Sequence, residues 1–292
     1  TELEVTFRNL FGGKVAVTLI AGVQSATAQS IGCKILNAST GGLDNAGPGA
    51  MLPTDLAGVP SLAGSLSGLQ SNWNNFDRYG SGTLALTDST GVSRNFDVQW
   101  DCPGSDSTGT GAGLGTPDGK LMDGFGYSWG PGAATPLGNS VYNSATANKP
   151  LVYISGLQAW ITNVPNAECY GVVLYTTGYN YYEPGEGYVE SVSGSPLNNT
   201  MVEGSSLVPH LFGQYTSHYA GTYIPVTSTS SGSPTPGNYM FFNGLTNDAV
   251  LLRLQCSGYG AGLNAFQFVP VYPSAPTAAT PTISPSSTVY AG

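Results

Sequence analysis

The chain has 292 residues, of which 41 are glycine, 20 are proline and only 9% are charged. Its formal net charge of −9 comes from 8 basic and 17 acidic residues. This balance argues against a nucleic-acid binder, because no run of Lys or Arg could neutralise phosphates, and against docking on an anionic membrane. Long amphipathic helices need a periodic pattern that is missing here, so the composition favours an all-β chain.

The first 28 residues allow two interpretations. In the first, they form a strand arm: residues 2–8 alternate with an apolar face of Leu3, Val5 and Phe7, a Gly-Gly pair can turn the chain, and residues 15–23 are apolar on both faces. In the second, they are a signal-peptide-like segment with Lys14, an apolar run and a small-residue end. The acidic Glu2 and Glu4 favour the strand arm, and the apolar run is too short for a transmembrane helix of about 20 residues.

From residue 29 the chain alternates short strand-like runs with connections rich in Gly, Ser, Asn and Pro. Many short strands with turn signals between them predict a sandwich or a barrel. The predicted strands are Ile31–Leu36, Gly82–Leu86, Ser93–Trp100, Leu151–Ile154, Gln158–Thr162, Tyr170–Thr176, Glu186–Val192, Tyr239–Phe242, Ala249–Gln255 and Ala265–Val271.

The C-terminal segment changes character. Residues 273–285 are rich in Pro, Ala and Thr, which indicates an extended linker. The pattern of Ser287–Tyr290 then predicts one short strand. We therefore expect an N-terminal strand arm over 1–28, a β-sandwich domain over 29–273, and a linker with a C-terminal strand over 274–292. The predicted fold class is all-β: a jelly-roll-like β-sandwich with strand-forming N- and C-terminal arms.

Four cysteines lie far apart in the sequence. They form no CxxC motif and no Cys/His cluster, which opposes a structural zinc site. In an exported protein, isolated cysteines on strands favour two disulfides, whose connectivity is one of three possibilities; the alternative is four buried free thiols. The disulfide candidates are Cys33, Cys102, Cys169 and Cys256.

A tyrosine-rich loop between residues 175 and 188 is the candidate ligand site. Its flat rings could stack on sugars while polar groups beside them bind hydroxyls, although tyrosines also suit subunit contacts or packing along a strand edge. The candidate sugar-binding residues are Tyr179, Tyr181, Tyr182 and Glu183.

We expect no catalytic residue. Residues 126–130 match the GxSxG pattern, but Pro131 follows at once and prevents the helix that a nucleophile elbow requires, so we interpret this stretch as a turn. Acidic residues near Trp100 and in the tyrosine-rich loop are interpreted as solvated. A structural calcium ion could use Asp101 and Asp106, which lie in loops of suitable composition but without EF-hand spacing.

Several motifs follow one another in a fixed order. They include "SIGCKILN", "QSNWNNF", "TPDGKLMDGF", "ITNVPNAECYGVVLYTTG" and "GLNAFQFVPV". This order resembles a galactose-binding-like β-sandwich domain of large secreted bacterial surface proteins, over about residues 29–273. The terminal "PTISPSSTVYAG" resembles the opening strand of the immunoglobulin-like segment that often follows in such proteins. The resemblance implies a fold and an extracellular compartment but no catalytic activity, and Cys33 departs from it where an aliphatic residue is common.

The functional expectation is a non-enzymatic structural protein at the bacterial cell surface. Copies of the chain would form a filament, sheath or surface layer through terminal strand exchange, because strand-forming arms at both ends can complete the sheet edges of neighbours. The assembly residues would be Leu3, Val5, Phe7, Val289 and Tyr290. The alternative is a carbohydrate-binding or adhesion module whose partner is an extracellular polysaccharide. Neither hypothesis involves nucleic acid, membrane insertion, or a cofactor other than calcium.

Overall fold

A computed structural model of the chain describes residues 3–8, 14–19, 29–36, 49–63, 66–77, 79–101, 104–107, 115–127, 151–178, 183–198, 200–215, 219–256 and 261–273. Strands β1, β2, β7 and β8 are described by their backbone alone. The chain divides into two compact units, which are treated separately below. One spans Ala26–Tyr272, and the other combines Thr1–Ser25 with Pro273–Gly292.

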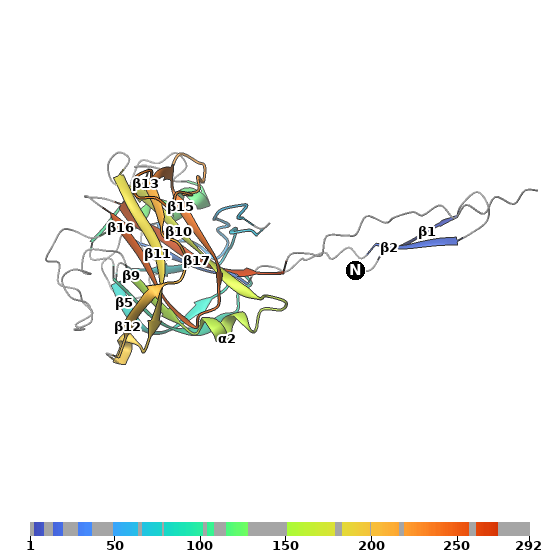
Figure 1. Ribbon diagram of the computed structural model, residues 1–292, viewed down its shortest axis with the longest axis horizontal. Coiled ribbons are helices and arrows are strands. Elements are labelled where there is room, and N and C mark those ends of the chain that lie inside the picture. The colour runs from blue at the N-terminus through green and yellow to red at the C-terminus, as the bar shows by residue number, and fades with distance from the viewer. Residues whose placement is uncertain are drawn as a thin grey trace, which may run out of the picture. The chain divides into compact units, whose positions relative to one another are not determined.

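The larger unit contains a seven-stranded sheet, here called sheet I (Figure 1). Its strand order is β15-β10-β17-β3-β4, and β8 pairs with both β17 and β7. All pairs are antiparallel except β3 with β4. The strands are β3 (Ile31–Ile35), β4 (Asn74–Phe76), β7 (Gly104–Ser107), β8 (Gly124–Tyr127), β10 (Cys169–Gly178), β15 (Tyr239–Leu245) and β17 (Ala261–Val271).

An eight-stranded sheet, sheet II, packs against sheet I. Its order is β14-β13-β11-β16-β9-β6-β5, and β12 pairs with β11. Only β13 and β14 run parallel among its pairs. The strands are β5 (Tyr79–Thr87), β6 (Ser93–Asp101), β9 (Leu151–Ser155), β11 (Glu183–Ser193), β12 (Val202–Ser206), β13 (Leu211–Tyr215), β14 (Thr235–Gly237) and β16 (Ala249–Cys256).

The main hydrophobic core lies between the two sheets. Alternate residues of each strand point inward, as the two-residue period of a strand requires. Phe76 of sheet I contacts Trp100 of sheet II with ring centroids 4.3 Å apart. Buried residues of this core include Cys33, Leu174, Phe266 and Phe268 from sheet I, and Phe96, Val98, Val152 and Leu252 from sheet II. The fold is therefore the all-β sandwich that the sequence predicts.

Sheet I is buried on both faces. On β10, Val172 and Leu174 point into the main core, whereas Val173 and Tyr175 belong to a second apolar cluster on the outer face. Segments from residues 51–73, helix α1 (Pro117–Leu121) and residues 219–226 contribute side chains to that cluster. This double burial explains why β10 reads as an unbroken apolar run rather than an alternating one.

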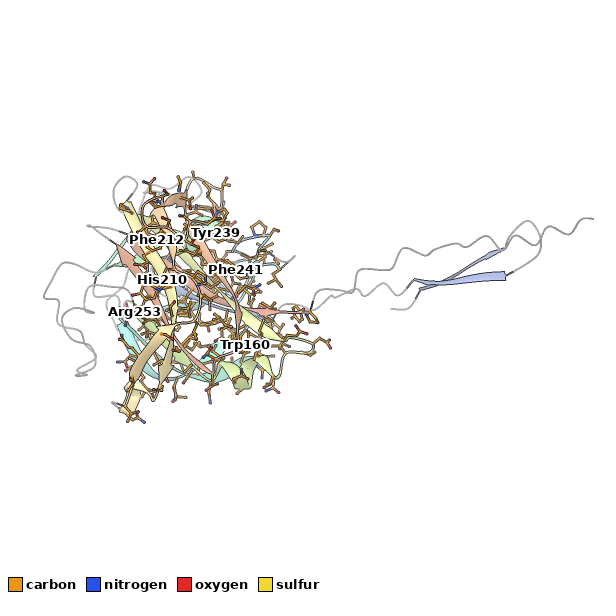
Figure 2. All side chains as sticks on the ribbon, viewed as in Figure 1. Trp160, His210, Phe212, Tyr239, Phe241 and Arg253 are labelled. Carbon is orange, nitrogen blue, oxygen red and sulfur yellow. The ribbon has the colours of Figure 1, made fainter. Side chains whose placement is uncertain are left out.

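One predicted strand is wrong. The predicted strand Gln158–Thr162 instead overlaps helix α2 (Leu157–Ile161), and Thr162 is the C-cap of that helix. Gly156 precedes it with a left-handed φ of 97°, which glycine adopts without a Cβ penalty. Leu157, Trp160 (labelled in Figure 2) and Ile161 are buried at the i, i+3, i+4 spacing of a helix, so the apolar residues fit a helical face. A short 3₁₀ turn, η1 (Pro196–Asn198), follows β11.

Within the predicted N-terminal strand arm, the structure describes two strands, β1 (Leu3–Arg8) and β2 (Lys14–Leu19). They form a two-stranded antiparallel sheet of their own, with six residue pairs from Leu3↔Leu19 to Arg8↔Lys14. The predicted C-terminal strand, Ser287–Tyr290, lies outside the described residues.

Lys34 on β3 is 1% exposed, and its burial lowers its pKa to about 7 although the charge of Asp123 opposes the shift. Above pH 7 the unfolded chain therefore binds more protons at this residue than the folded chain, so stability contributed here rises with pH up to the ordinary lysine pKa. Between pH 7 and about pH 9 the wild type should gain ~2 kcal/mol of unfolding free energy relative to Lys34→Met. Urea unfolding of both proteins at the two pH values measures this difference, and parallel pH profiles would contradict it.

Candidate functional site

The two sheets end together at one corner of the sandwich. Strand β4 is the last strand of sheet I, and β5 is the last strand of sheet II. Asn74 of β4 joins them: its Nδ2 donates to the carbonyls of Gly32 and Thr87 at 2.9 and 3.0 Å, and its Oδ1 accepts the Thr87 N–H at 2.8 Å. One amide side chain thus takes the place of a strand-to-strand ladder at this corner.

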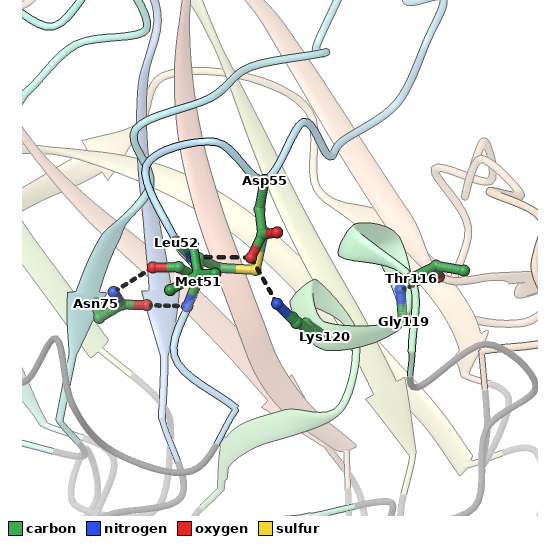
Figure 3. A network of polar contacts seen from close by, with 7 residues as sticks. All are labelled: Met51, Leu52, Asp55, Asn75, Thr116, Gly119 and Lys120. Atoms are coloured by element: carbon green, nitrogen blue, oxygen red, sulfur yellow. Dashed lines mark hydrogen bonds and ion pairs between the residues drawn. The ribbon is translucent and has the colours of Figure 1, made fainter.

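The neighbouring Asn75 holds the loop that covers the corner (Figure 3). Its Oδ1 accepts the N–H of Met51 at 2.7 Å, and its Nδ2 donates to the carbonyl of Met51 at 2.9 Å. Asn75 and Met51 are buried, with exposed fractions of 1% and 2%. The N–H and C=O of Met51 are buried away from water, and these two hydrogen bonds provide the partners that both groups need.

An ion pair ties the same loop to helix α1. Lys120 Nζ lies 2.8 Å from Asp55 Oδ2, which also accepts the Leu52 N–H at 2.8 Å (Figure 3). Burial opposes ionisation of Asp55, but the hydrogen bonds from Lys120 and Leu52 and the charge of Lys120 outweigh it and lower its pKa. Thr116 begins the helix as N-cap by accepting the Gly119 N–H at 3.0 Å.

A surface cleft of about 400 Å³ lies beside these residues. Most of its polar side chains are already hydrogen-bonded within the protein, since Asn74 and Asn75 both bind backbone groups. The half-exposed Leu52 and the exposed Pro53 and Ala85 offer apolar surface instead. The cleft therefore fits apolar side chains better than a sugar, which needs free hydrogen-bonding groups. Its lining is Met51, Leu52, Pro53, Asn72, Trp73, Asn74, Asn75, Ala85 and Thr87.

A second polar cluster lies on the outer face of sheet II (Figure 2). Arg253 pairs with Glu190 at 2.7 Å and with Glu203 at 2.5 Å. Burial disfavours its charge, but the attraction of Glu190 and Glu203 is larger and raises its pKa. Arg253 is 3% exposed, so these carboxylates compensate a charge that would otherwise be buried alone.

His210 completes this cluster. Its ring stacks on Tyr188 with centroids 4.3 Å apart, and its Nδ1 contacts Glu186 Oε1. Glu186 and Glu190 lie four residues apart on β11, which places them roughly 13 Å apart along the strand. The paired carboxylates of glycosidases are separated by about 5–9.5 Å, so these two do not match that geometry.

The structure describes only some of the predicted site residues. Tyr179, Tyr181, Tyr182, Val289 and Tyr290 lie outside the described residues. Glu183 begins β11 opposite Tyr215, and Leu3, Val5 and Phe7 occupy β1; only the backbone of these four is described. The same holds for the calcium candidates Asp101 and Asp106, on β6 and β7. Among the described residues no group of three or more His, Cys, Asp or Glu could hold a metal ion.

The prediction that all four cysteines form disulfides is wrong, because Cys33 and Cys169 are free thiols. Burial raises the pKa of each thiol, and nearby Glu168 adds to the shift at Cys169. Cys33 lies opposite Phe266, and Cys169 opposite Val271, on different sides of β17, so they are too far apart to pair with each other. Cys102 lies outside the described residues, and Cys256 ends β16 with only its backbone described.

Sequence reasoning noted the Asn-Trp-Asn-Asn motif at residues 72–75 only as part of a resemblance. Two asparagines of this motif, Asn74 and Asn75, close the corner beside the cleft. A signal was available, because polar amides next to a buried Trp within a short strand must find hydrogen-bond partners. The position of β5 at a sheet edge had no such signal, since strand order is a property of the tertiary structure.

No described helix is long and apolar enough to span a membrane. Comparisons with protein-family models, with curated proteins and with solved structures found no match. The likeness to galactose-binding-like domains therefore stays a prediction.

Replacing Asn75 by Ala should destabilise the protein by about 2–4 kcal/mol, because both backbone groups of buried Met51 lose their partner. Asn163→Ala is the matched control: its side chain makes one exposed hydrogen bond to Ala159, and its cost should be under about 0.5 kcal/mol. Urea unfolding at constant pH measures both. Equal costs for the two variants would show that Asn75 does not hold the corner.

Proposed function

We propose that this chain is a structural subunit of an extracellular assembly, a filament, sheath or surface layer, whose copies join through their terminal strands. The observation that carries the proposal is the hairpin β1–β2, which forms a sheet separate from the sandwich. The described strands of the sandwich add no third strand to it.

The register of the hairpin makes it amphipathic. Residues opposite each other in an antiparallel pair lie on the same face. One face carries the pairs Leu3↔Leu19, Val5↔Val17 and Phe7↔Val15, and every one of these positions is apolar. The other face carries Glu4↔Thr18, Thr6↔Ala16 and Arg8↔Lys14, which are mostly polar. Such an apolar face is stable in water only when something covers it.

A two-stranded hairpin is marginally stable by itself, and no other described strand pairs with either outer edge of this one. A second copy of the chain can supply both an edge partner and a cover, and its Ser287–Tyr290 segment is a strand-forming candidate with Val289 and Tyr290. Because the head and tail of the chain are different surfaces, such a contact is heterologous and propagates when it does not close into a ring. The absence of catalytic activity remains part of the proposal.

Carbohydrate binding is the second candidate. It rests on Tyr179, Tyr181, Tyr182 and Glu183, and the cleft beside β4 and β5 adds no support, because its amides are already hydrogen-bonded within the protein. A polysaccharide pull-down signal that disappears in the Tyr181→Ala, Tyr182→Ala double variant would favour this function over assembly.

A charge on the apolar face of the hairpin should prevent assembly. In Val5→Lys the contact between copies loses the transfer free energy of a buried valine side chain, roughly 1.5–3 kcal/mol. Association should therefore weaken by about tenfold or more. Thr6→Lys, on the opposite face of the same strand, is the matched control and should assemble like the wild type.

Size-exclusion chromatography and negative-stain microscopy at several protein concentrations measure the outcome. A wild-type chain that stays monomeric at high concentration would overturn the proposed function. Equal assembly of the two lysine variants would overturn the role of the apolar face.

A further inference from the structure

Strand β5 is an edge of sheet II over its whole length. It has nine residues and pairs only with β6, in an unbroken register from Tyr79↔Asp101 to Thr87↔Ser93. Apart from the contact of Asn74 at Thr87, none of the described residues is paired with its other side.

The free backbone groups of β5 can be assigned by their alternation. At the end of the strand, Asp88 donates to the Val92 carbonyl at 2.9 Å, whereas Thr87 turns both its N–H and its C=O toward Asn74 and away from β6. In an antiparallel strand every second residue points its backbone groups to the same side. Ser81, Thr83 and Ala85 therefore direct their N–H and C=O groups outward, and all three residues are exposed.

Among the described residues, the edge strands β4, β12 and β14 and the start of β15 are protected, and β5 is not. Natural proteins shorten edge strands, place proline or charge on them, or cover them. Strands β4 and β14 have three residues each, and β14 contains Pro236. Strand β12 carries Glu203, and residues 224–226 cover the start of β15 through hydrogen bonds with Tyr239. Strand β5, "YGSGTLALT", has neither proline nor charge.

The apolar cleft lies beside this edge. Ala85 and Thr87 of β5 form part of its lining, together with Leu52, which is 50% exposed, and Pro53. Addition of a strand to a sheet edge gains affinity from backbone hydrogen bonds and specificity from pockets that take alternate side chains. The β5 edge can supply the backbone hydrogen bonds, and the cleft can supply the pocket for side chains.

We infer that the outer edge of β5 is the acceptor for the β1–β2 hairpin of a second copy of this chain. The inference rests on the proposed assembly and names its acceptor surface. A six-residue hairpin strand presents three outward-pointing residues, enough to pair with Ser81, Thr83 and Ala85 and leave only Tyr79 at the start of β5 without a partner from the hairpin. The positions of its apolar face would then fall on the side of the sheet that carries Ala85, next to Leu52 and Pro53, while Glu4, Arg8 and Lys14 occupy positions on the opposite face.

The donor and the acceptor are different surfaces of one chain. Each subunit therefore offers a free hairpin to one neighbour and a free β5 edge to another, which is the head-to-tail geometry of an open polymer. The Ser287–Tyr290 segment is left to pair with the remaining edge of the hairpin.

Proline at residue 85 tests the acceptor. In Ala85→Pro the outward N–H is lost and the ring blocks an incoming strand, while the ladder with β6 is untouched, so association should weaken by at least about tenfold. Ala85→Ser keeps the N–H at nearly the same size and should assemble like the wild type. Circular dichroism melting checks that both variants fold.

A mixing experiment then identifies the contact. The Ala85→Pro copy retains a working hairpin, and a Val5→Lys copy retains a working β5 edge. Each should be monomeric alone, and an equimolar mixture should form a one-to-one dimer that grows no further, measured by analytical ultracentrifugation. Hydrogen exchange of the wild type should show concentration-dependent protection at Ser81, Thr83 and Ala85.

The outcomes separate the two proposals. Assembly of Ala85→Pro equal to that of Ala85→Ser, or a mixture that stays monomeric, would overturn the β5 acceptor while leaving assembly itself in place. A wild-type chain that never associates would overturn the proposed function. If Ala85→Pro fails to fold, unchanged exchange at residues 81, 83 and 85 of the assembled wild type would still overturn the acceptor.

Discussion

The double burial of sheet I is the constraint on which the rest of the structure depends. A sheet covered on both faces has no water for its polar neighbours, so each buried polar group needs a partner within the protein. This chain meets the requirement with neutral amides rather than charges. Gln267 on β17 accepts from Tyr175 Oη at 2.8 Å and donates to Gly68 O and Gln70 Oε1 at 3.0 and 2.8 Å.

The same chemistry closes the corner of the sandwich. Asn264 donates to the Met122 carbonyl at 2.8 Å and so joins β17 to the segment after α1, while Asn74 and Asn75 join the last strand of sheet I to β5 and to the covering loop. Amides can donate and accept at once, which lets one side chain satisfy both backbone groups of a residue. Low charge is therefore compatible with a large interior. The buried cationic side chains of the described residues, Lys34 and Arg253, lie near carboxylates, and the carboxylates of Asp77 and Asp88 are buried as well.

The corner amides stop at Thr87, and no described strand pairs with the outer side of the remainder of β5. A soluble protein normally guards such an edge against unwanted pairing. Here the unguarded edge belongs to the same chain as an amphipathic hairpin whose apolar face needs a cover. In the assembly that we propose, these two features, each an aggregation hazard alone, are complementary surfaces of neighbouring copies. Under this proposal, the cleft beside the edge would select which side chains can dock there.

The sequence by itself determined the fold class and most strand positions, because alternation, turn residues and the absence of helical periodicity are local properties. It also determined the N-terminal strands, since Leu3, Val5 and Phe7 alternate with polar residues. It wrongly predicted a strand at Gln158–Thr162, where an apolar run suits either structure until Gly156 adopts a left-handed φ and a helix follows. The free state of Cys33 and Cys169, the amide closure by Asn74 and the edge position of β5 depend on strand order. Only the tertiary structure decided these, because it brings together residues that are distant in the chain.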